Sequence, residues 1–114
     1  MTGPATGYDA YAWDVVEQIL AAQRPMGVVV TGGGSRAVSW LLNHPGASRV
    51  VVEAQVPYHG AAVEEYLGCP GPHRADEETA RRLAAQAGAR ARRLAEDETV
   101  LGVGATAALA TDRE

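Results

Sequence analysis

Three segments of the sequence contain residue types that can bind or attack a small ligand. TGGGS (31–35) and PYHG (57–60) each follow an apolar run, GVGAT (102–106) extends a third, and each segment is expected to form a turn at the end of a strand. Glycines before a helix let a ligand approach the backbone, whose N–H groups favour phosphate or a developing oxyanion. Tyr58 and His59 can transfer protons or orient a substrate. Together the segments indicate a binding or catalytic site.

Two of these segments also have an interpretation without a ligand. The glycine segment follows neither the P-loop nor the dinucleotide-binding pattern, so a tight strand-to-helix turn explains it equally well. Taken singly, Tyr58 and His59 are typical of a tyrosine packed at a strand end and an exposed histidine. Cys69 and His73 have a spacing that a metal could use, but two ligands fall far short of a site. We therefore predict no metal and no cofactor.

The apolar periodicity predicts alternating helices and strands that must position these segments. Asp9 and Asp76 are expected to cap the first and the longest helix, Ser35 to cap the second, and Pro25 and Pro45 to end the first two. The predicted helices are 9–24, 35–44, 60–67 and 76–94, and the predicted strands are 27–30, 48–56 and 98–104.

This alternation predicts an α/β fold, with a mainly parallel sheet between two helical layers. Ligands bind beyond the carboxyl ends of parallel strands, so the three segments are expected to meet at one edge. Three strands are few, because typical sheets have five or six. We therefore expect a homo-oligomer or a partner chain that completes the sheet, or a domain truncated at its C-terminus.

Composition limits the class of protein. The 114 residues predict one domain, 9–114, after a flexible lead at 1–8. A net charge of −4 speaks against binding of nucleic acid or of a membrane surface. Cys69 is the only cysteine, and neither a signal peptide nor a membrane-spanning run is apparent, so we expect a cytoplasmic protein.

The order of motifs resembles a known family. The glycine turn, "PGAS" after it, Tyr58, "YLG", "EETARRLA" and "LGVGATAAL" are similar to the CinA C-terminal domain, from about Asp9 to Arg113. That family includes nicotinamide-nucleotide amidases, which convert nicotinamide mononucleotide to nicotinic acid mononucleotide and ammonia. The resemblance implies a small nucleotide ligand and a domain that continues beyond the position of Arg113.

The resemblance also assigns roles to residues. The family's nucleophilic serine falls on Thr31 and its tyrosine on Tyr58, whereas its lysine falls on Val63, so His59 is the hypothetical base. Two functions stay open, an amide hydrolase of a pyridine or similar nucleotide and a catalytically degenerate domain that binds a nucleotide or a protein. The expected substrate-binding residues are Gly32, Gly33, Gly34, Ser35, Gly104, Ala105 and Thr106.

Overall fold

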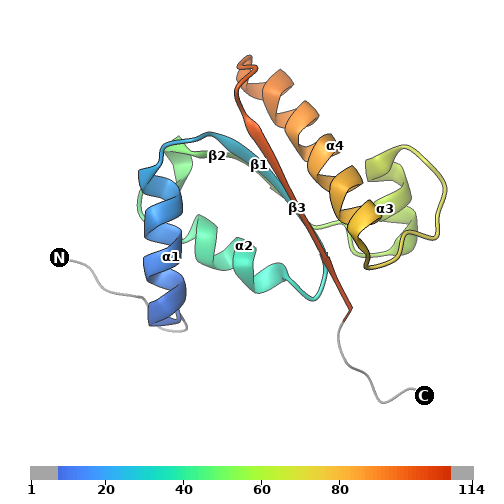
Figure 1. Cartoon of the computed structure of the whole chain (residues 1–114), viewed down its shortest axis with the longest axis horizontal. Helices are drawn as coiled ribbons and strands as arrows, with labels where there is room; N and C mark the ends of the chain where they lie inside the picture. The colour runs from blue at the N-terminus through green and yellow to red at the C-terminus, as the bar shows by residue number, and fades with distance from the viewer. Residues whose placement is uncertain (1–7, 109–114) are drawn as a thin grey trace.

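The computed structural model of the chain describes residues 8–108 (Figure 1). Most of the predicted lead, 1–7, and the C-terminal residues 109–114 therefore lie outside the described part. None of the described helices is long and apolar enough to cross a membrane. The elements are α1 (Ala10–Ala21), β1 (Met26–Gly32), α2 (Ser35–Leu42), the short 3-10 helix η1 (Ala47–Arg49), β2 (Val51–Gln55), α3 (Gly60–Leu67), α4 (Glu77–Ala95) and β3 (Leu101–Ala107).

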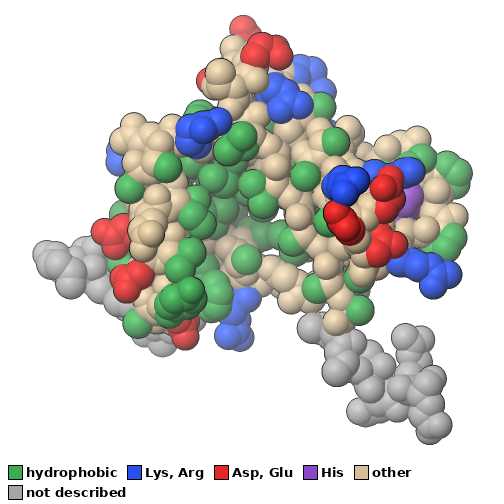
Figure 2. Space-filling view, in the orientation of Figure 1, with side chains coloured by type: hydrophobic (Ala, Val, Ile, Leu, Met, Phe, Trp, Pro, Cys, Tyr) green, Lys and Arg blue, Asp and Glu red, His purple; other side chains and the backbone are tan. Residues whose placement is uncertain are grey.

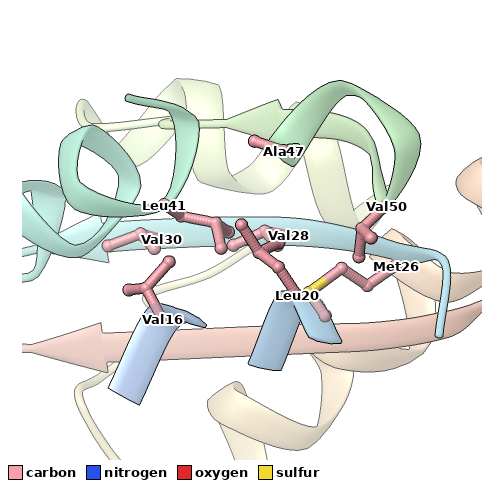
Figure 3. Packing of buried hydrophobic residues seen from close by; sticks show 8 residues of the cluster. All are labelled: Val16, Leu20, Met26, Val28, Val30, Leu41, Ala47 and Val50. Carbon is pink, nitrogen blue, oxygen red and sulfur yellow. The ribbon is translucent and has the colours of Figure 1, made fainter. Parts of the chain in front are cut away.

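The strands form one parallel sheet in the order β2-β1-β3, which confirms the predicted α/β fold. Alternate residues of β1 point to opposite faces, as in any strand. Val28 and Val30 pack with α1 and α2 on one face (Figure 3). Val29 packs with Leu83 and Ala87 of α4 on the other face. The predicted three layers are therefore present, and β1 lies at the centre of the core.

Side-chain caps begin α1 and α4 where the sequence predicted them. Asp9 accepts hydrogen bonds from the N–H groups of Tyr11 and Ala12, at 2.8 and 3.0 Å. Asp76 accepts one from the N–H of Thr79 at 2.8 Å. Each bond satisfies a backbone donor that has no partner within the first helical turn. The predicted bounds of α3 match the structure, and Gly68 ends this helix in the left-handed conformation, with φ of 73°.

Some predicted boundaries are wrong. Ser35 is the first residue of α2 and does not cap it, because the glycine turn ends one residue earlier and Gly34 takes the N-cap position. The second strand starts at Val51, since the preceding residues form η1. The apolar spacing of α4 also predicts an inward-facing Leu94, but this side chain is 53% exposed.

The third strand shows the largest difference. It spans Leu101–Ala107, so Gly104, Ala105 and Thr106 lie within a strand and not in a turn. The physical reason is the packing of α4 on this strand. A Cβ atom on Gly102 would lie 2.0 Å from the carbonyl oxygen of Ala84, and a Cβ atom on Gly104 would lie 2.5 Å from the backbone nitrogen of Ala84. Glycine lets the helix backbone approach the strand this closely.

An ion pair ties α4 to the opposite edge of the sheet. Arg90 donates from Nε and Nη2 to the two carboxylate oxygens of Glu53 on β2, each at 2.7 Å. Gln55 donates a further hydrogen bond to Glu53 at 3.1 Å. The hydrogen bonds from Arg90 lower the pKa of Glu53, outweighing the effect of burial. Since both side chains of the pair are largely buried, this contact orients α4 on the sheet.

Candidate functional site

A cleft of about 900 Å³ opens beyond the carboxyl ends of β1 and β3. Its walls come from these two strand ends, the start of α3 and the loop between α3 and α4, which meet in space although they lie far apart in the sequence (Figure 1). This is the edge at which parallel sheets bind their ligands. The lining residues are Thr31, Gly32, Gly33, Tyr58, Gly60, Val63, Glu64, Gly71, Pro72, His73, Ala75, Thr106, Ala107 and Ala108.

The cleft brings together residues from all three predicted segments. Thr31, at the end of β1, is 7% exposed and pairs in register with Thr106 of β3. Tyr58 follows β2 and is 74% exposed, so its ring stands free at the rim. Five of the predicted site residues line the cleft: Thr31, Gly32, Gly33, Tyr58 and Thr106.

The other predicted site residues have different surroundings. His59 accepts a hydrogen bond at Nδ1 from the N–H of Ala61, at 3.0 Å, and so caps α3. Gly104 lies beneath α4, and Ala105 is exposed between residues that face this helix. Within the described part of the chain, the lining of the cleft does not include Gly34, Ser35, His59, Gly104 or Ala105.

The glycine turn has a packing requirement of its own. Gly32 has φ of 83°, and a Cβ atom there would lie 1.8 Å from the carbonyl oxygen of Ala107. The N–H of Gly33 donates to the same oxygen at 3.1 Å. The close approach of β3 therefore explains the glycine at position 32, and the N–H of Gly33 is already bonded. The later N–H groups of the turn belong to Gly34 and Ser35, which do not line the cleft, so the turn is a poorer oxyanion site than its sequence suggests.

Two titratable residues of the cleft were not predicted. Glu64 lies on α3 and His73 in the following loop, and both approach Gly71. The position of a Cβ on Gly71 would be 3.1 Å from Glu64 Oε2 and 3.1 Å from His73 Cδ2. His73 Nε2 lies 3.1 Å from the carbonyl oxygen of Cys69, to which it can donate. No periodic pattern marks these residues, because the packing of α3 brings Glu64 to the cleft and the path of the following loop brings His73 there.

Val63 marks the position at which the family resemblance implies a lysine. Its side chain is 6% exposed and forms part of the cleft wall. In this chain the wall is apolar there.

Neither metal ligands nor relatives identify the site further. No group of three or more histidine, cysteine or acidic residues able to hold a metal occurs in residues 8–108. No family model, curated protein or solved structure matches this chain. The case for a function therefore rests on the motifs and on the geometry of the cleft.

Proposed function

We propose that the cleft binds a small nucleotide and hydrolyses a carboxamide on it, with Thr31 as nucleophile. The observation that carries this proposal is the convergence of Thr31, Tyr58 and Thr106 in one cleft at the carboxyl edge of the sheet. A cleft of about 900 Å³ is within the range of small-molecule sites. The nucleotide class comes from the family resemblance.

The chemistry would proceed through an ester. The hydroxyl oxygen of Thr31 attacks the carboxamide carbon, its proton passes to a base and then to the departing nitrogen, and ammonia leaves. Water hydrolyses the ester and regenerates Thr31. A threonine hydroxyl is a weak nucleophile, so this scheme needs a proton acceptor in the cleft. Glu64 and His73 supply a carboxylate and an imidazole there, whereas His59 uses one ring nitrogen to cap α3.

A second candidate is a domain that binds the nucleotide without hydrolysing it. Val63 favours this function, because it places an apolar side chain where the resemblance implies the catalytic lysine. Such a domain would keep the cleft and lose only the chemistry. For either function, a nucleotide ligand and a single cysteine fit a reducing cytosol.

The decisive experiment measures ammonia release from nicotinamide mononucleotide. The wild type is compared with Thr31→Val, which removes the hydroxyl and keeps the shape, and with Ser48→Ala, which removes an exposed hydroxyl outside the cleft lining. The hydrolase requires release by the wild type and Ser48→Ala, and its loss in Thr31→Val. Equal release by Thr31→Val refutes Thr31 as the nucleophile.

Binding is measured separately by the melting temperature, since a ligand of the native state stabilises it. A nucleotide that raises the melting temperature of the wild type without ammonia release supports the binding domain. If the wild type releases no ammonia and no nucleotide raises its melting temperature, both functions are refuted. Where release occurs, Glu64→Gln and His73→Ala identify the base, because loss of a general base lowers kcat by about 10²- to 10⁴-fold.

A further inference from the structure

The outer edge of β3 has no strand partner among the described residues. In natural proteins, charged side chains or proline on an edge strand prevent it from pairing with a strand of another chain. β2, the other edge, carries Glu53 at its centre, and its ion pair with Arg90 crosses to α4. β3 contains no charged residue and no proline over its seven residues. It is therefore the longer and the unprotected edge.

One face of β3 is also uncovered. Gly102 and Gly104 face α4, so Leu101 and Val103 point to the opposite face of the sheet. These two side chains are 41% and 43% exposed. Because α1 and α2 cover mainly β1 and the start of β2 on this face, they leave the side chains of β3 accessible.

A stripe of α1 is exposed and apolar as well. Tyr11, Val15 and Ile19 follow one another at intervals of four residues, which places them on one side of the helix. They are 78%, 37% and 39% exposed. Figure 2 shows hydrophobic side chains gathered in a hollow between α1 and β3. We call Tyr11, Val15, Ile19, Leu101 and Val103 the α1–β3 patch.

We propose that the α1–β3 patch and the edge of β3 form a two-fold interface between two copies of this chain. A two-fold axis at the edge of β3 places this strand antiparallel to itself, so the outward backbone groups of each copy find partners in the other. The product is one continuous sheet of six strands, twice the three that residues 8–108 form in one copy. A typical sheet has five or six strands.

The size of the patch fits a second copy. The exposed parts of its five side chains amount to roughly 500 Å² per chain, and a stable dimer buries roughly 800 Å² per partner. The backbone edge of the seven-residue strand supplies much of the remainder. The same interface would reach the rim of the cleft, because Thr106 and Ala107 of β3 also line it.

The experiment measures molar mass by light scattering and sedimentation over a range of concentrations, without nucleotide, so its outcome is independent of the proposed function. We expect a dimer of the 11.9 kDa wild-type chain. Val103→Lys places a charge on the pairing edge and should weaken dimerisation at least tenfold. Leu94→Lys is the matched control, because Leu94 is equally apolar and 53% exposed but lies outside the patch.

Far-UV circular dichroism checks that each variant folds. Should Val103→Lys fail to fold, Val15→Glu in α1 takes its place, and the same loss of dimer is expected. A wild type that stays monomeric at the highest concentration overturns the proposal. A dimer that survives the charged substitution in a folded variant, or that Leu94→Lys disrupts equally, overturns it too.

Discussion

Replacing Gly102 by alanine tests whether the glycines of β3 are needed for packing or are kept for a ligand. The added Cβ would lie 2.0 Å from the carbonyl oxygen of Ala84 and 2.5 Å from the nitrogen of Gly88. Non-bonded atoms pack best at about 3.5 Å, so α4 would have to move away by roughly 1 Å or more. Both clashing atoms belong to the helix backbone, and no side-chain rotation can relieve the contact.

We expect the free energy of unfolding to fall by about 3 kcal/mol, the upper part of the range for overpacking a core. For a domain of this size, this loss corresponds to a decrease in melting temperature of roughly 12 to 20 °C. Gly60→Ala is the matched control, because nothing lies within 4 Å of its Cβ position at the start of α3. That variant should be as stable as the wild type, or more stable by up to about 1 kcal/mol.

The assay is urea unfolding followed by far-UV circular dichroism, in the absence of any nucleotide. If the free energy of unfolding falls with urea concentration at the same slope in both variants as in the wild type, the same structure is being unfolded. A Gly102→Ala protein within about 0.5 kcal/mol of the wild type would refute the packing argument. The glycines would then need another explanation, such as the approach of a ligand.

Two further predictions concern the ion pair and a helix cap. Arg90→Ala should cost about 1 to 3 kcal/mol at neutral pH, because it leaves the largely buried Glu53 carboxylate without its partner. Since Arg90 lowers the pKa of Glu53, the advantage of the wild type is present above the ordinary value of 4.5 and is lost as pH falls through the lowered pKa. Urea unfolding across this range measures it, and a difference that persists undiminished in acid would contradict the assignment. Asp9→Ala should lower the free energy of unfolding by about 1 kcal/mol, because α1 loses its N-cap. Asp9→Asn should keep most of this stability, since asparagine can also cap a helix. Equal losses of stability in the two variants would argue against capping.

Local signals in the sequence predicted the helices well. Asp76 and the apolar spacing of α4 act within a few residues, so the start of this helix needs no tertiary information. The same holds for α3, which ends where Gly68 adopts a positive φ. The alternation of helices and strands predicted the parallel sheet, and the glycine turn was correctly placed at its carboxyl edge.

The candidate site was predicted only in part. Thr31, Tyr58 and Thr106 lie in the cleft because each follows or ends an element of the sheet, and sheet topology was inferable. Glu64 was missed because the sequence does not show which side of α3 faces the cleft, and His73 because the course of the loop between α3 and α4 brings it there. Gly104 was assigned to a binding turn, but glycine is needed there because the backbone of α4 packs against it. This contact joins segments that are distant in the sequence.

The sequence by itself determined the order of helices and strands, the caps that begin α1 and α4, and the three segments that could carry chemistry. These properties depend on residues close together in the chain. Only the tertiary structure decided which glycines face a helix, which side chains line the cleft, and which edge of the sheet stays open. The physical reason is that close packing and burial join residues far apart in the sequence, such as Ala84 with Gly102 and Gly32 with Ala107.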